Sequence, residues 1–175
     1  FAAPPYTNSG VIDKLEDILH SLNKYQMKIR LFIVPFTKLQ EKIYEVSTEG
    51  YPITIMRRMM YRIATEVAHK LHINCLASGE SVGQVASQTL TSMIVINNVT
   101  NMPVIRPVAC MDKLEIIDIA TKIGTYETSI LPYEDCCTVF VPKHPVINPK
   151  LSECIRMEEK IDYEELIDKA VEDVY

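Results

Sequence analysis

Residues 73–90 constrain the fold of this chain more than any other segment. Residues 73–77 form a short apolar run of strand length that has no helical period. A break that contains Gly79 follows, and a helix-compatible run then extends to Leu90. The pattern predicts a strand, a tight turn and a helix start, and in an open parallel sheet such a turn lies at the carboxyl end of a strand, where ligands usually bind. An ordinary strand-to-helix connection explains the same pattern, and the segment is not a P-loop because no Gly-Lys-Ser/Thr follows the turn.

Predicted helices and strands alternate along most of the chain. Apolar residues spaced three and four apart predict helices, and continuous apolar runs predict strands that are buried on both faces. After the end of a strand at residue 1, the predicted helices cover residues 11–22, 37–46, 54–71, 82–96 and 113–123, and the predicted strands cover residues 29–36, 73–77 and 104–109. Thr37 and Asp112 are expected to cap two of these helices. The order predicts an α/β fold in which helices cover a parallel sheet.

The character of the sequence changes after residue 124. Residues 131–145 are loop-like, with three prolines and two adjacent cysteines, and residues 151–175 predict an acidic C-terminal helix or helix pair. The tail holds nine acidic and three basic residues, which leaves 15 basic and 14 acidic residues in 1–150. The overall charge of −5 therefore does not exclude a nucleic-acid partner for the body of the protein. We expect one domain over residues 1–150, with residues 151–175 packed on it as a helical tail.

Length and composition are typical of a single globular domain. No apolar run approaches the roughly 20 residues of a membrane span, so we expect no membrane partner and a cytoplasmic location. The chain begins with Phe1 rather than methionine, so we expect it to be a piece of a longer protein. Its five cysteines are odd in number and lack a C-x-x-C spacing, which indicates neither a disulfide framework nor a zinc site.

Three arginines lie near the start of the predicted helix 54–71. Arg57 and Arg58 are adjacent, and Arg62 lies four residues after Arg58 on the same helix face. A solvated stripe on a core helix is one interpretation of this pattern. The other is an arginine near the helix start whose planar guanidinium meets a phosphate. The local pattern does not choose between the two.

Several longer strings together resemble a known family. They are TIMRRMM, GESVGQVASQT, VIRP, MDK, IGTY and PYEDCCT, at residues 54–60, 79–89, 104–107, 111–113, 123–126 and 132–138. In this order they resemble the bacterial tRNA 4-thiouridine synthetases, also called tRNA uracil 4-sulfurtransferases. The likeness covers essentially all of residues 1–150.

The resemblance implies a three-layer, Rossmann-like nucleotide α-hydrolase fold of the PP-loop ATP pyrophosphatase type. It implies that ATP activates uracil O4 of a tRNA as an adenylate, and that persulfide sulfur from a cysteine desulfurase then displaces AMP. The same route supplies sulfur for the thiazole of thiamine, which implies a sulfur carrier protein of that pathway as a further partner. Magnesium is expected with ATP, although no residue is assigned to it. A homodimer is left open.

The resemblance also implies roles for individual residues. It assigns ATP binding to four positions, with Phe1 at a strand end beside the adenine, Arg57 near the nucleotide, Gly79 after a strand and Gln88 on the segment that follows. All four lie at predicted strand ends or on the helices that leave them.

Cys137 is implied as the sulfur-carrying cysteine. Persulfide chemistry needs a thiolate on an accessible loop, and cations favour the thiolate. Lys143 and His144 follow in the same loop and could supply positive charge, whereas two acidic residues precede the pair. Cys136 is the alternative carrier, because only the family register separates the two neighbours.

The chain departs from the family pattern in two respects. No rhodanese-like domain follows Tyr175, and because forms of the family that carry one use a cysteine there to resolve the disulfide, the resolving thiol is not assigned here. The PP-loop string Ser-Gly-Gly-x-Asp-Ser is absent from these 175 residues, and the resemblance places it before Phe1. We therefore expect an N-terminally truncated domain that is inactive on its own. The alternatives are another PP-loop ATP pyrophosphatase, which would activate a different group, and a nucleotide-binding module without catalysis.

Overall fold

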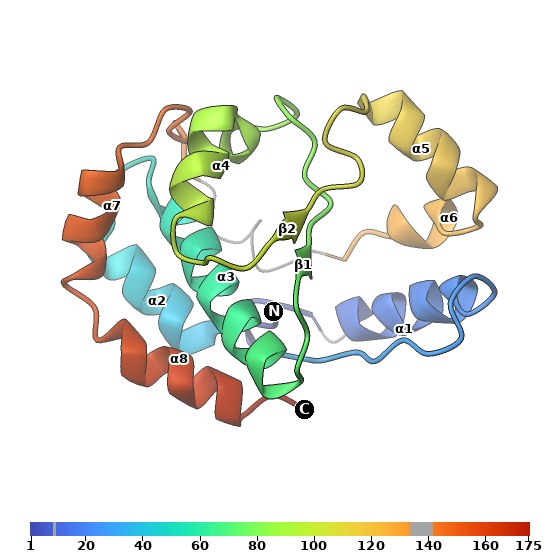
Figure 1. The fold of residues 1–175 in the computed structure, drawn as a ribbon, viewed down its shortest axis with the longest axis horizontal. Helices are drawn as coiled ribbons and strands as arrows, with labels where there is room; N and C mark the ends of the chain where they lie inside the picture. The colour runs from blue at the N-terminus through green and yellow to red at the C-terminus, as the bar shows by residue number, and fades with distance from the viewer. Residues whose placement is uncertain (9, 134–141) are drawn as a thin grey trace.

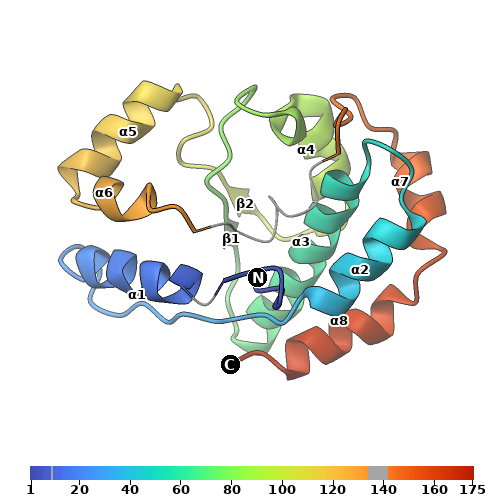
Figure 2. The ribbon, with the colours of Figure 1, turned by 180° about the vertical axis from the view of Figure 1, so that it is seen from behind.

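The computed structural model describes residues 1–8, 10–133 and 142–175, arranged around one long central helix (Figures 1 and 2). Within these ranges the helices are α1 (Gly10–Leu22), α2 (Thr37–Val46), α3 (Pro52–Lys70), α4 (Leu90–Asn97), α5 (Lys113–Lys122), α6 (Tyr126–Ser129), α7 (Leu151–Glu158) and α8 (Tyr163–Glu172), the 3₁₀ turn is η1 (Ala86–Gln88), and the strands are β1 (Leu76–Ala77) and β2 (Val104–Ile105). Helix α3 packs against α2, α4, α7 and α8, so it organises the core.

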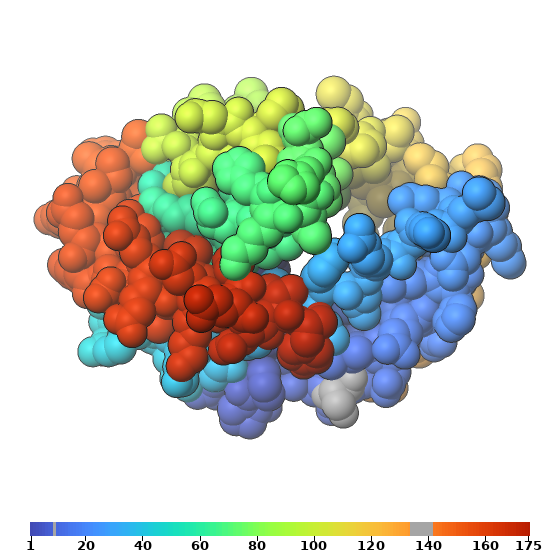
Figure 3. All heavy atoms as spheres, turned by 60° about the horizontal axis from the view of Figure 1, so that its bottom comes forward, coloured from blue at the N-terminus to red at the C-terminus, as the bar shows by residue number. Residues whose placement is uncertain are grey.

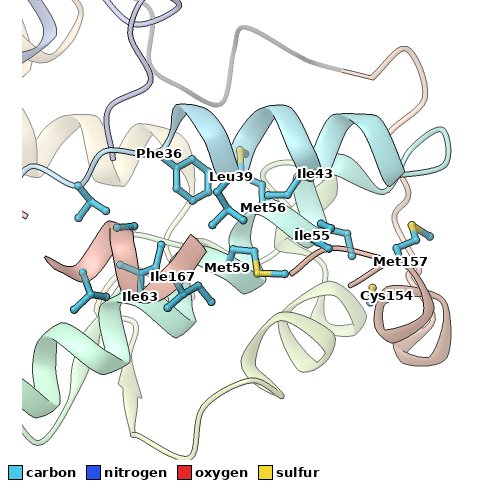
Figure 4. Close-up of a cluster of buried hydrophobic side chains, with 14 of the residues drawn as sticks. Phe36, Leu39, Ile43, Ile55, Met56, Met59, Ile63, Cys154, Met157 and Ile167 are labelled. Carbon is cyan, nitrogen blue, oxygen red and sulfur yellow. The ribbon is translucent and has the colours of Figure 1, made fainter. Parts of the chain in front are cut away.

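The sequence of α3 explains its central place. Pro52 stands in its first turn, where a missing N–H costs no helical hydrogen bond. Ile55, Met59 and Ile63 follow at intervals of four and therefore lie on one face, and all three are fully buried. Figure 4 shows this face packed against side chains from α2 and from the C-terminal helices, namely Phe36, Leu39, Ile43, Cys154, Met157 and Ile167.

Two short parallel pairings are present among the described residues. Strands β1 and β2 are parallel, with Leu76 opposite Val104 and Ala77 opposite Ile105. The N-terminal segment makes a separate parallel bridge, in which Ala2 N–H donates to Val34 O at 2.9 Å and Phe36 N–H donates to Ala2 O at 2.8 Å. These pairings confirm an α/β fold with parallel strands. The paired stretches are shorter than the predicted strands, because apolar runs set which residues can be buried but a ladder extends only where a neighbouring strand supplies partners.

Two local predictions were wrong. The helix expected from residue 82 begins at Leu90, because Gly83 adopts a φ of +81° and its N–H donates to Gln88 O at 2.9 Å, which closes residues 83–88 into a loop. Thr89 then caps α4 by accepting from Ser92 N–H at 3.1 Å. Thr37 is the first residue of α2 rather than its cap, and its hydroxyl donates to Pro4 O at 2.8 Å.

The predictions for the last third of the chain were closer to the observed structure. Asp112 caps α5 in a reciprocal capping box with Glu115, and Gly124 follows the helix with a φ of +78°. The acidic tail forms a helix pair, α7 and α8, and Figure 3 shows these C-terminal residues lying directly against the middle of the chain. Residues from both 1–150 and 151–175 share the buried core. In the part of the chain that the structure describes, no helix is long and apolar enough to cross a membrane.

Cys154 provides a test of this packing. Its side chain is fully buried, and burial raises the pKa of the thiol to about 11, so at pH 8 roughly one such thiol in a thousand is ionised. Cys75 and Cys110 are exposed. We expect iodoacetamide at pH 8 to alkylate both of them in the native protein well before Cys154, as measured by mass spectrometry of the peptides. Denaturant should remove the difference, and equal labelling without denaturant would contradict the packing.

Candidate functional site

The carboxyl ends of β1 and β2 lie at one edge of their parallel pair, and polar residues follow both strands. Gly79 and Glu80 come shortly after β1, and Arg106 comes directly after β2. Arg57, from the first two turns of α3, reaches the same place. Ligands of parallel sheets usually bind at this edge, so these residues form the candidate site.

Glu80 is the centre of the site. Its side chain is 2% exposed, and it accepts hydrogen bonds from three residues. Arg57 Nη2 donates to one carboxylate oxygen, while Tyr61 Oη at 3.0 Å and Arg106 Nε at 2.7 Å donate to the other. Two guanidinium groups and one carboxylate leave a net charge of about +1 at this edge, which suits an anionic ligand.

The charge state of Glu80 follows from these contacts. Burial alone raises the pKa of its carboxyl group, but the charge of Arg57 and the hydrogen bonds from Arg106 and Tyr61 outweigh burial, so the pKa lies below its ordinary value. Burial raises the pKa of Tyr61, so its phenol stays protonated and acts as the donor. At neutral pH the site therefore holds a charged carboxylate between two charged arginines.

Contacts with Ser87, in addition to the one with Glu80, hold the Arg57 side chain in place. Its Nη1 donates to the carbonyl oxygen of Ser87 at 3.2 Å and to the hydroxyl oxygen of Ser87 at 3.3 Å. Its side chain is nevertheless 15% exposed, and that of Arg106 is 19% exposed. Each guanidinium is thus held in place by several contacts, and each side chain keeps some exposure to solvent.

Arg58 and Arg62 form a second centre on the same helix. Arg58 donates from Nε and Nη2 to the two oxygens of Glu158 at 2.6 and 3.0 Å, and Arg62 donates to the same carboxylate at 2.9 and 3.1 Å. Arg58 is 1% exposed, and the Arg62 guanidinium lies 4.6 Å from the centre of the Tyr163 ring. The interpretation of the arginines as a solvated stripe was therefore wrong. This second centre joins α3 to the C-terminal helices.

Gln88 and Gly79 lie beside the first centre. Gln88 Oε1 accepts from Ser81 N–H at 3.2 Å, and Ser87, its neighbour, binds Arg57. A side chain added at Gly79 would meet no described atom within 4 Å, so space is open next to Glu80. The structure thus brings Arg57, Gly79 and Gln88 together.

Phe1 lies elsewhere. Its ring contacts the Phe36 ring edge-on, with the ring centres 5.3 Å apart. It lines an apolar cavity of about 320 Å³ beside α1, together with Leu31, Ile33 and Tyr175 among others. Of the hydrogen bonds and ion pairs described, none joins Phe1 to Arg57, Gly79 or Gln88.

Cys136 and Cys137 lie outside the described residues. The chain on both sides of residues 134–141 is anchored. On one side, the Tyr133 ring packs against Gly10, so that a Cβ atom added to this glycine would lie 2.5 Å from a carbon of the ring. On the other side, the hydroxyl of Thr89, which is the residue after Gln88, donates to the carbonyl oxygen of Ile147 at 2.7 Å. Ile147, ten residues after Cys137 in the chain, therefore lies beside the residue that follows Gln88.

Sequence reasoning gave no role to Glu80, Tyr61 or Arg106. A usable signal was present for Glu80, which lies three residues after the apolar run 73–77. Arg106 fell inside the predicted strand 104–109, so its place at a strand end was not predicted. Tyr61 gave no comparable signal. Among residues 1–8, 10–133 and 142–175, no three His, Cys, Asp or Glu side chains are grouped as metal ligands would be.

Comparison with known proteins places this geometry in context. The family described as "Thiamine biosynthesis protein (ThiI)" matches residues 1–163. The chain is 53% identical over 173 residues to a probable tRNA sulfurtransferase of Halothermothrix orenii, covering 99% of this chain and 43% of that protein. It is 50% identical over 171 residues to the probable tRNA sulfurtransferase of Brevibacillus brevis, covering 98% and 43%.

A solved structure is similar over the whole chain. It is the crystal structure of a 4-thiouridine synthetase–RNA complex with bound ATP, with a TM-score of 0.92 and 39% identity, covering 100% of this chain and 46% of that one. The chain thus spans less than half the length of these proteins.

Proposed function

This chain belongs to the ThiI family of thiamine biosynthesis proteins, and from that premise we propose that the whole protein is an ATP-dependent tRNA sulfurtransferase. It forms 4-thiouridine in tRNA and also supplies sulfur for the thiazole of thiamine. The observation that carries the proposal is the pair of fixed, partly exposed arginines at the carboxyl edge of β1 and β2. A cationic edge of this kind suits the phosphates of a nucleotide, and the similar solved structure holds ATP.

The reaction has two steps. Uracil O4 attacks the α-phosphorus of ATP and pyrophosphate leaves, which makes O4 part of a good leaving group. The terminal sulfur of a cysteine persulfide then bonds to C4 as AMP leaves, and a second thiol cleaves the S–S bond, becoming oxidised to a disulfide as the 4-thio group is released. A cysteine desulfurase loads the persulfide, and a sulfur carrier protein receives sulfur on the thiamine branch. Bound magnesium would neutralise the phosphate charge.

The fold that fits this chemistry is a Rossmann-like PP-loop ATP pyrophosphatase domain. Residues 1–150 belong to that domain, and residues 151–175 are the helical tail on it. Since the chain spans under half the length of its relatives, we assign the PP-loop and the main tRNA-binding surface to the rest of the whole protein. Residues 1–175 alone should then be inactive, and a homodimer is compatible with this arrangement.

The proposed roles of the ATP-binding residues follow their positions. Arg57 meets the phosphates, because its guanidinium is held at the site edge and remains partly exposed. Gly79 gives the nucleotide close access to the strand end, since nothing described fills the space at its Cα. Gln88 offers its side-chain NH₂ to the nucleotide while its oxygen accepts from Ser81. Phe1 flanks the adenine, a role that would require the nucleotide to extend toward the N-terminal strand.

Arg57→Ala in the whole protein tests the assignment. Loss of a charged hydrogen-bond donor costs about 1.5–3 kcal/mol, so we expect the KM for ATP to rise by about 10- to 100-fold. Steady-state AMP formation with tRNA, cysteine desulfurase and cysteine gives the measurement. Arg156→Ala is the matched control, because Arg156 is exposed on α7 and pairs only with Glu153 among the described residues. An unchanged KM in Arg57→Ala would contradict the role.

The same assay separates the alternatives. AMP release without 4-thiouridine would favour another PP-loop ATP pyrophosphatase. ATP binding without AMP release would favour a nucleotide-binding module.

A further inference from the structure

We propose that Glu80 is a positioning residue, whose buried carboxylate holds Arg57 and Arg106 in the orientation that receives the nucleotide phosphates. This inference rests on the proposed function, because it takes ATP as the ligand of Arg57. Neither the sequence motifs nor the resemblance gives Glu80 or Arg106 a role.

The first support is the way the three side chains share one carboxylate. Arg57 uses one oxygen, and Arg106 and Tyr61 use the other. The carboxylate therefore lies between two guanidinium groups that come from different elements, α3 and the segment after β2. Without it, two like charges would face each other, and each long side chain could turn away into water.

The second support is that each arginine has a further contact that agrees with the orientation set by Glu80. Arg57 also donates to Ser87, and Arg106 Nη2 donates to Asn97 Oδ1 at 3.0 Å. Ordering a free arginine side chain costs conformational entropy. The fold has already ordered these two side chains, so a ligand that binds them does not incur the cost of ordering them.

The third support comes from comparison with Glu158 of α7, the other carboxylate that binds arginines of α3. Glu158 also binds two arginines and is similarly buried, at 4% exposure of its side chain against 2% for Glu80. Of its two arginines, Arg58 is buried, and Arg62, whose side chain is 18% exposed, lies against the Tyr163 ring. Arg57 and Arg106 have no ring over them in the part of the chain that the structure describes. The two ion clusters thus differ in their place in the fold, because the Glu80 cluster lies at the carboxyl edge of β1 and β2, whereas the Glu158 cluster joins α3 to the C-terminal helices.

The experiment compares Glu80→Gln with Glu158→Gln in the whole protein. Both changes remove a buried negative charge between two arginines and keep the side-chain shape. For Glu80→Gln we expect the KM for ATP to rise by about tenfold or more while kcat of AMP formation changes by less than about threefold, because Arg57 loses its fixed orientation before the ligand binds. For Glu158→Gln we expect the melting temperature to fall at least as far with a KM within about twofold of wild type. Kinetics are measured at a temperature at which both variants are folded.

Three results would overturn the proposal. An unchanged KM in Glu80→Gln, with only a lower melting temperature, would make Glu80 purely structural. An equal rise in KM in both variants would mean that general loosening is the cause. Wild-type protein without ATP-dependent AMP formation would defeat the proposed function as well, so the two failures are distinguishable.

A milder variant keeps the test decisive should Glu80→Gln fail to fold. Tyr61→Phe removes only the hydroxyl that donates to Glu80 and retains the ring in its place. We expect it to raise the KM for ATP by about threefold with kcat unchanged. A KM equal to that of wild type would overturn the positioning role.

Discussion

Replacing Glu158 with alanine in the whole protein is expected to lower the free energy of unfolding by about 3–5 kcal/mol. The carboxylate is the partner of both Arg58 and Arg62, and Arg58 is 1% exposed. Alanine would leave a buried guanidinium whose remaining described partner is the carbonyl oxygen of Val95. A buried charge without a counter-charge is among the most costly defects in a folded protein. Urea unfolding followed by circular dichroism measures the change from the transition midpoint and slope.

Glu153→Ala is the matched control for this prediction. Glu153 also lies on α7 and also pairs with an arginine, Arg156, at 2.6 Å. That pair is exposed to solvent, so its loss should cost no more than about 1 kcal/mol. Similar small effects of both substitutions would show that the Arg58–Glu158–Arg62 cluster does not hold the C-terminal helices on α3.

Cys137→Ala in the whole protein is expected to reduce 4-thiouridine formation to background while leaving ATP binding intact. Alanine has no sulfur to carry as a persulfide, so the covalent transfer cannot take place at this position. Cys136→Ala should retain thiolation, because the family register assigns the sulfur to the second cysteine. Mass spectrometry of nucleosides from tRNA that has been incubated with ATP, cysteine desulfurase and cysteine measures the product.

The reverse outcome would reassign the sulfur carrier. Loss of thiolation in Cys136→Ala alone would shift the register by one residue. Full activity in both variants would move the carrier to another thiol, and the exposed Cys75 and Cys110 would be better candidates than Cys154. Cys154 is the weakest candidate, because its side chain is fully buried and burial raises the pKa of its thiol to about 11.

The fold shows which local sequence patterns are sufficient to predict a helix and its cap. The predicted helix 54–71 and the observed α3 differ by only two residues at its start and one at its end, since its apolar face repeats every three or four residues. Asp112 capped α5 as predicted, because a capping box needs only residues three apart in the chain. The segment after Gly79 was predicted less well. Its apolar residues suit a helix, yet residues 83–88 close a loop on themselves and delay α4 to Leu90.

The candidate site shows the same division between local and distant information. The sequence by itself placed Arg57, Gly79 and Gln88 near strand ends, and it supplied the motifs of the family. Only the tertiary structure decided what the three arginines of α3 do. Arg57 and Arg58 are neighbours in the chain, but successive residues of a helix point in directions about 100° apart. One therefore meets Glu80, 23 residues away, and the other meets Glu158, 100 residues away. Which carboxylate each arginine meets depends on where β1 and α7 pack against α3, and no local pattern contains that information.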